Sequence, residues 1–183
     1  LAWSIPIALG YSHKGFRVMG TTPDYFQYFS YGKKRQLSFS QGKPFENVFD
    51  VVLGAQVAQK LGYQLGDQIV LAHGLGKTSF SLHSNSPFQV TGILSATGTP
   101  IDQTVHVSLQ GIEAVHTDLQ KDIETPGRAL TSKPLSALNP KSIPAFMLRL
   151  TSRLATRELP RAITYSCNDP LSAMLPRVAH VSS

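Results

Sequence analysis

The sequence has a single cysteine, few charged residues and no long apolar run. Because Cys167 is alone among 183 residues, no disulfide can form within the chain, and no signature of a catalytic cysteine surrounds it. Charged residues make up 15% of the chain, which is low for a free cytosolic protein. The most apolar stretch, LAWSIPIAL at the start, is interrupted by Pro6 and is far shorter than the roughly 20 residues that span a bilayer. We therefore expect no transmembrane helix in this sequence.

An initiator methionine and a secretory signal are also missing. The chain starts at Leu1, and its first residues lack both a charged n-region and a small-residue cleavage site. We interpret the sequence as a piece of a longer polypeptide. Hydrophobic residues make up 42% of it, which is enough for a buried core in one domain, or in two small subdomains that share a core.

The basic residues are scattered rather than gathered into a binding surface. The net charge is +6, and the only cluster is Lys33-Lys34-Arg35, next to a glycine. Three adjacent charges are too few for the basic footprint that nucleic-acid binding needs, so we expect no nucleic-acid partner. The cluster is interpreted as a solvated loop, and a position near a membrane explains the same charge.

A segment that starts at Val52, VLGAQVAQKLGYQLGDQIVL, organises the expected fold. Leu53, Val57 and Leu61 recur at every fourth position, which predicts a short helix with one apolar face. Gly62 stands where a left-handed residue ends such a helix, and the Gln-Leu-Gly-Asp that follows supplies turn chemistry. The next residues, Ile-Val-Leu, predict the start of a strand. Because so short a helix is unstable alone, it must pack against neighbouring strands.

The remaining pattern predicts an α+β fold. Expected strands cover Ser4–Leu9, Phe16–Met19, Ser79–His83, Phe88–Leu94, Val105–Leu109 and Ala145–Thr151, and expected helices cover Tyr25–Phe29, Gly111–Asp122 and the residues from Ser152 to about Ile163. We expect one shared core of Leu53, Val57, Leu61, Ile69, Val90, Ile93, Val105 and Val107. The loop Ile123–Lys141 is the best candidate for a boundary between subdomains.

No motif in the chain predicts a nucleotide or metal site. Gly76-Lys77-Thr78 resembles the end of a P-loop, but Leu71 occupies the position of the required first glycine. The histidines are His13, His73, His83, His106, His116 and His180, and no two have the spacing of a helical zinc site. We therefore predict no cofactor and no metal ligand in this domain.

Catalysis is likewise not indicated by the sequence. No G-x-S-x-G elbow is present, and Asp102 near His106 is well explained as a turn residue. The aromatic cluster Tyr25–Tyr31 allows two interpretations: core packing with a wetted edge, or the wall of a ligand site. The second would suit a freestanding periplasmic binding protein or enzyme, and we keep it as the alternative function.

Several segments resemble one known family. VVLGAQVAQKLGYQLGDQIVLAHG, followed by PFQVTGILSATGTPIDQTVHVSLQGIEAVH, resembles the extracytoplasmic domain of FtsX-like ABC transporter permeases. The resemblance extends to GFRVMGTTPDYF near the start and to KSIPAFMLRLTSRLATRELPRAI and PLSAMLP near the end. The F-x-V-x-G-I-L pattern is shared with the MacB-like periplasmic core domain. Pro160 departs from the family, because it interrupts a helix that is continuous in relatives.

The resemblance implies a fold and a setting. It implies two lobes, a porter-like lobe from residues 1–50 and 141–183 and an inserted mixed α/β lobe from residues 51–140. The domain would lie between the first and second transmembrane helices of an inner-membrane permease, on the periplasmic side of a Gram-negative cell. Its partners would be a cytoplasmic ATPase that binds the ATP, a second permease subunit, and a periplasmic adaptor or cargo.

The resemblance also implies that this domain couples ATP hydrolysis to movement outside the cytoplasm. The family offers no catalytic, cofactor-binding or metal-ligating residue to carry over, so we expect no enzyme activity, and no residue is assigned to partner binding. Its cargo varies among lipoproteins, peptides, antibiotics, lipids and a cell-wall hydrolase activator, and nothing in this sequence selects one of them.

Overall fold

The computed structural model describes residues 2–73, 87–121, 135 and 145–149. The chain divides into two compact units, Leu1–Ser4 with Leu148–Ser183, and Ile5–Met147. In the first unit, the backbone N–H of Ala2 donates to the carbonyl oxygen of Arg149 at 2.8 Å. The second unit contains most of the described secondary structure. No helix among the described residues is long and apolar enough to cross a membrane.

The described residues form eleven strands, three α-helices and one 3₁₀ helix. The strands are β1 (Trp3–His13), β2 (Phe16–Thr21), β3 (Ser30–Tyr31), β4 (Arg35–Gln36), β5 (Phe39–Gly42), β6 (Asp50–Leu53), β7 (Gln68–Ile69), β8 (Ala72–His73), β9 (Phe88–Leu94), β10 (Thr104–Ser108) and β11 (Ala145–Arg149). The helices are α1 (Asp24–Tyr28), α2 (Ala55–Leu61), η1 (Pro100–Gln103) and α3 (Leu109–Lys121).

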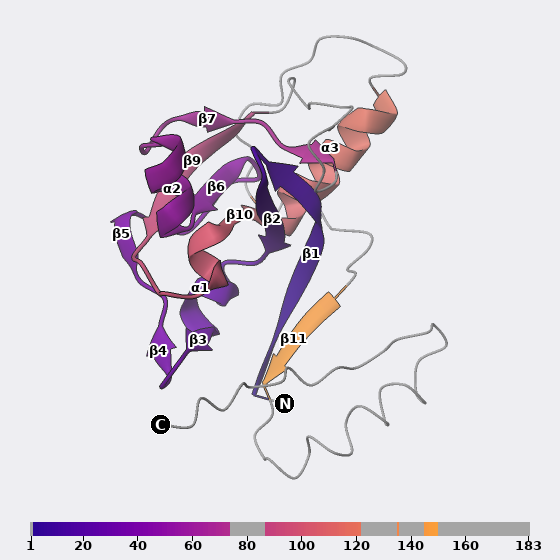
Figure 1. The fold of residues 1–183 in the computed structure, drawn as a ribbon. Coiled ribbons are helices and arrows are strands. Elements are labelled where there is room, and N and C mark those ends of the chain that lie inside the picture. Colours follow the sequence, from indigo (N-terminus) through magenta and orange to yellow (C-terminus); the bar gives the residue numbers. More distant parts are fainter. Residues whose placement is uncertain (1, 74–86, 122–134, 136–144, 150–183) are drawn as a thin grey trace, which may run out of the picture. The chain divides into compact units, whose positions relative to one another are not determined.

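Nine of the strands form one mixed sheet, in the order β11-β1-β2-β10-β6-β9-β5, with β7 beside β9 and β8 beside β1 (Figure 1). The pairs β2–β10 and β6–β9 are parallel, whereas β1–β2, β6–β10 and β5–β9 are antiparallel. The strands β3 and β4 form a separate hairpin beside α1, away from α3 in Figure 1. A mixed sheet with a few helices confirms the predicted α+β class.

The central strands are buried on both faces of the sheet. Successive side chains along each strand point to opposite faces, so each strand contributes residues to both sides. Leu53 and Val105 belong to the large apolar core that also includes residues of α2 and α3. Val52 and His106, which pair across β6 and β10, alternate onto the opposite face, where the rings of α1 contact His106. The sheet therefore separates this large core cluster from the aromatic residues of α1.

The predicted helix in the organising segment is confirmed, with a later start. Gly62 has φ +69 and ends α2 in the left-handed conformation, as its sequence position indicated. Leu53 does not lie in the helix but ends β6, because its backbone pairs with β9 and β10. Gly54 is then the N-cap of α2, and a Cβ there would lie 2.3 Å from the carbonyl oxygen of Ile101, so only glycine fits this junction.

The predicted core is confirmed for seven of its eight members. Leu53, Val57, Ile69, Val90, Ile93, Val105 and Val107 are buried in one cluster. Leu61 is only partly buried and packs against that cluster from its edge. The organising helix is therefore anchored by Val57 more than by Leu61.

The first strand is longer than predicted. The pattern indicated a loop over residues 10–15, whereas β1 continues to His13 and only Lys14 and Gly15 form the turn to β2. Gly10 has φ +130, a backbone conformation that glycine adopts freely, and the pairing with β2 shifts register between Ala8 and Tyr11. The strand therefore passes through an irregularity instead of ending there.

Strands on both sides of residue 50 belong to the same sheet, since β2 pairs with β10 and β5 pairs with β9. The boundary at residue 50 thus does not separate two sheets among the described residues, and the two-lobed arrangement stays a prediction. The predicted strand over 79–83, the boundary loop over 123–141 except residue 135, and the helix that starts at Ser152 lie outside the described residues.

Candidate functional site

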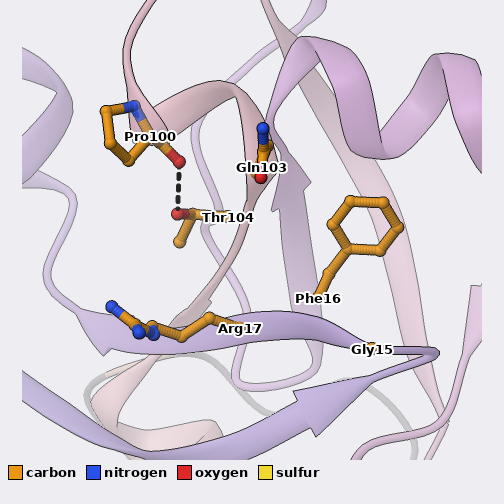
Figure 2. Close-up of a pocket in the computed structure, with 6 residues that line it drawn as sticks. All are labelled: Gly15, Phe16, Arg17, Pro100, Gln103 and Thr104. Carbon is orange, nitrogen blue, oxygen red and sulfur yellow. Dashed lines mark hydrogen bonds between the residues drawn. The ribbon is translucent and has the colours of Figure 1, made fainter.

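A surface hollow of about 310 Å³ lies where β2 and β10 begin (Figure 2). It is lined by Gly15, Phe16, Arg17, Pro100, Gln103 and Thr104. Arg17 and Thr104 are partners in the parallel pair of β2 and β10, so the register of the sheet brings these two segments together. The tight turn before β2 and the 3₁₀ helix η1 before β10 form the rim.

The polar groups of the hollow are mostly engaged within the protein. The Thr104 hydroxyl donates to the carbonyl oxygen of Pro100 at 3.0 Å, and the Gln103 amide donates to Oε1 of Gln56 at 3.1 Å. The Arg17 side chain is exposed, points away from the Phe16 ring, and forms no ion pair with any described residue (Figure 2).

The chemistry of this lining is limited. It contains no carboxylate, imidazole or thiol, so it holds no group suited to general acid–base catalysis at neutral pH. The hollow is at most a place where the Arg17 guanidinium meets an anionic group.

Asp102, a candidate partner of His106 in the sequence, has a structural role. Its buried carboxylate accepts hydrogen bonds from the backbone N–H of Thr97, the Thr97 hydroxyl and the backbone N–H of Gly98, each at 2.8 Å. These bonds close the turn that leads from β9 into η1. The turn interpretation of Asp102 is confirmed, and none of its hydrogen bonds with the described residues goes to His106.

His106 is fully buried on the aromatic face of the sheet. Its ring stacks on Tyr25 at a centroid distance of 5.5 Å, and its Nδ1 donates to the carbonyl oxygen of Val52 at 3.3 Å. The Nε2 atom has no hydrogen-bond partner among the described residues. Burial lowers the pKa of His106 to about 4, against a weaker opposing effect of the Val52 bond, so the ring is neutral at physiological pH.

His13 is a second buried and satisfied histidine. Its Nδ1 lies 2.7 Å from the carbonyl oxygen of Val70, and its Nε2 lies 2.9 Å from the Tyr63 hydroxyl. Burial lowers the pKa of His13, the Val70 bond opposes this, and the charge of Lys14 adds to it. A neutral ring donates through Nδ1 and accepts through Nε2, so His13 joins the end of β1 to the segments around Tyr63 and Val70.

The aromatic cluster Tyr25–Tyr31 belongs largely to the core. Tyr25 and Phe26 are buried, and their rings contact Phe29, Phe39, Phe45 and His106. Burial also raises the pKa of the Tyr25 hydroxyl beyond its usual range. Tyr28 remains 42% exposed, so the cluster offers an edge to solvent, but its two buried rings form no open ligand wall.

Metal ligands are not gathered among the described residues, where no three His, Cys, Asp or Glu side chains come together. The backbone of His73 lies in β8 and that of His116 in α3. The segment with Gly76-Lys77-Thr78, together with His83, Cys167 and His180, lies outside the described residues. The predicted absence of catalytic, cofactor-binding and metal-ligating residues stays a prediction.

The sequence did not indicate the hollow or the buried hydrogen bonds of His13. The hollow depends on the parallel pairing of β2 with β10, which are separated by more than 80 residues of chain. His13 gave one local signal, because it directly precedes a Lys-Gly turn. Its hydrogen-bond partners, however, come from residues 63 and 70. Both features are set by long-range pairing.

Comparison with known proteins gives the family. The family model of the MacB-like periplasmic core domain matches residues 3–163. Among solved structures, the chain is similar to a crystal structure of a domain assigned to a permease protein of Porphyromonas gingivalis, at 11% identity and a TM-score of 0.44. That similarity covers 92% of this chain and 65% of the other. No curated protein matches.

The family match covers most of the chain and confirms the resemblance found in the sequence. The chain belongs to the family of MacB-like periplasmic core domains.

Proposed function

We propose that this chain is the periplasmic domain of an inner-membrane ABC transporter permease of the FtsX-like type, and that it transmits movement driven by cytoplasmic ATP hydrolysis. The observation that supports this proposal is the family match over residues 3–163. In such an assembly, the ATP is bound by a separate cytoplasmic subunit and this domain carries no cofactor. A second permease subunit and a periplasmic adaptor or cargo are its other proposed partners.

The sheet is suited to the transmission of movement. β1 and β11 are neighbours in the sheet order, and Ala2 donates its backbone hydrogen bond to Arg149. The resemblance implies that both segments lead toward membrane helices. β1 then pairs with β2, with a register shift between Ala8 and Tyr11, and β2 pairs with β10 in an unbroken register. A displacement of β1 is therefore passed on to the centre of the sheet, as in other rigid-body transitions.

The alternative function is less well supported. A freestanding binding protein or enzyme would need convergent polar groups in a pocket. Tyr25 and Phe26 are buried against other rings, and the hollow at Arg17 presents one free charged group among its lining residues. Neither place holds a nucleophile beside a base.

Cell fractionation tests the setting. An antibody against this domain should detect a polypeptide much larger than 19.9 kDa that stays in carbonate-washed inner membranes. The epitope should become sensitive to added protease when the outer membrane alone is opened. A soluble product of about 19.9 kDa would overturn the proposal and favour the freestanding alternative.

Transmission through β1 is tested by loosening its start in the full-length permease. A flexible Gly-Ser insertion between Ala2 and Trp3 should abolish transport-dependent growth while the cytoplasmic ATPase still hydrolyses ATP. The same insertion between Ser95 and Ala96, in the loop between β9 and η1, is the matched control and should leave growth unchanged. If the insertion before Trp3 gives a folded permease with normal growth, the domain does not transmit movement through β1.

A further inference from the structure

The β3–β4 hairpin presents a compact group of three cations. Its turn, Gly32-Lys33-Lys34, is followed directly by Arg35 in β4. Gly32 has φ +53 and Lys34 has φ +61, so the chain reverses tightly through two left-handed residues. Arg35 pairs with Tyr31 across the hairpin, and every residue from Gly32 to Gln36 is exposed. We call Lys33, Lys34 and Arg35 the basic tip.

The basic tip is not neutralised by the protein. Among the described residues, no carboxylate forms an ion pair with any of its three cations, and no ring lies beneath them. Two other exposed lysines of the described residues are engaged: Lys43 pairs with Glu46, and Nζ of Lys14 lies 5.2 Å from the centroid of the Tyr63 ring. The tip therefore concentrates free positive charge at one exposed place.

Two tyrosines flank the basic tip. Tyr31 is the residue opposite Arg35, and Tyr28 comes from α1, which contacts β4. Tyr28 is 42% exposed and Tyr31 is half-buried, so both tyrosines keep surface that is accessible to solvent. A tyrosine ring that is partly apolar and partly polar is favoured where water meets the headgroups of a bilayer.

We propose that the basic tip docks on the anionic lipid headgroups of a membrane surface. Binding to a planar membrane requires a high density of positive charge but no complementary pocket. The tip is a turn in which residues 32–36 are all exposed. An acidic segment of another protein would also match the charge. The flanking tyrosines favour a lipid surface, because cations beside amphipathic rings are typical of membrane-interface contacts. The inference rests on the proposed function for the presence of a membrane, but it is tested without transport.

Sedimentation with lipid vesicles tests the proposal on the 183-residue chain. The chain should bind vesicles that contain phosphatidylglycerol and should not bind vesicles of phosphatidylcholine alone. Each cation near an anionic surface strengthens binding about fivefold, so the triple variant K33Q/K34Q/R35Q should bind on the order of 100-fold more weakly. Added salt should weaken binding of the unmodified chain, because the contact is exposed.

A charge-matched variant controls for net charge. K14Q/K43Q/K60Q removes three exposed cations outside the hairpin and should retain nearly all vesicle binding. The proposal is wrong if the unmodified chain does not bind anionic vesicles, or if both triple variants lose binding equally. Binding to soluble polyglutamate but not to vesicles would assign the tip to an acidic protein partner instead. Circular dichroism of each variant verifies that the fold is intact.

Discussion

The carbonyl oxygen of Val52 lies 3.3 Å from Nδ1 of His106, directly across the pair of strands β6 and β10. The same ring has an unpartnered Nε2 among the described residues and stacks on Tyr25. His106 is therefore held as a neutral ring within an aromatic core, where a positive charge would lack solvation. We therefore expect its protonation to be linked to unfolding.

This arrangement predicts a loss of stability in acid. The pKa of His106 is lowered from 6.5 to about 4 by burial, so below pH 6.5 the unfolded chain takes up a proton that the folded chain does not. The free energy of unfolding should therefore fall as the pH decreases from about 6.5 toward 4, by about 3 kcal/mol in total. Urea unfolding at several pH values measures this.

The variant His106→Phe isolates the contribution of this ring. It retains the stacking on Tyr25 and removes the unpartnered nitrogen, but it loses the Nδ1 hydrogen bond to Val52, so at pH 7.5 its stability should lie within about 2 kcal/mol of the unmodified chain. Its stability should depend less on pH below 6.5. The lowered pKa of His13 acts in the same direction and should leave a smaller slope. An unchanged pH profile in this variant would show that His106 is not the group that titrates.

A second prediction concerns Asp102. Asp102→Ala removes a buried carboxylate and leaves the backbone N–H groups of Thr97 and Gly98 without their acceptor. We expect a loss of about 2–4 kcal/mol in the free energy of unfolding, with the full-length permease still assembled at low temperature.

The control for Asp102 is a carboxylate outside the core. Asp24 is exposed in the first turn of α1, and Asp24→Ala should cost less than about 1 kcal/mol. Equal effects of the two substitutions in urea unfolding would contradict the assigned role of Asp102.

The third prediction compares two residues of α2. Val57 is fully buried, whereas Leu61 is only partly buried at the edge of the core. Val57→Ala should cost about 2–3 kcal/mol, and Leu61→Ala should cost about 1 kcal/mol, below the range of about 2–5 kcal/mol for a fully buried leucine. Thermal and urea unfolding of both variants measure the difference. A larger loss for Leu61→Ala would place this side chain deeper than the structure does.

Much of the local structure was predictable because its signals are local. β9 follows the alternating residues Phe88–Leu94, and α2 ends at Gly62, where a side chain would be strained by a positive φ. Leu53 shows the limit of such arguments. Its spacing from Val57 suits a helix, but backbone pairing with two strands, β9 and β10, places it in β6.

The candidate sites were less predictable, since each depends on segments far apart in the chain. Arg17 lines the hollow because β2 pairs with β10. His106 lies among aromatic rings because its pairing with Val52 in β6 places it on the face of the sheet that α1 covers. The basic tip is different: its three cations are adjacent in sequence, and the structure adds the left-handed turn and the neighbouring tyrosines. A cluster of adjacent residues can be identified directly in a sequence, whereas the pairing of distant strands cannot.

The last prediction separates a mechanical domain from an enzyme. In the full-length permease, His13→Ala, His106→Phe, Asp102→Ala and Arg17→Gln cover the buried imidazoles, the buried carboxylate and the hollow. If none is catalytic, transport-dependent growth in each variant should follow the amount of folded permease, measured by immunoblot and limited proteolysis. Growth at reduced temperature should then rescue the destabilised variants, because folding rather than chemistry limits them.

The matched control removes ATP hydrolysis in the cytoplasmic partner, which should abolish growth while the permease stays folded. A catalytic residue would behave like that control. If one of these four variants is present at the unmodified level, resists protease equally and still loses all growth, that residue belongs to an active site. The proposal of a non-enzymatic domain would then be wrong. Arg17→Gln is the most informative of the four, because an exposed side chain can be replaced with little effect on folding.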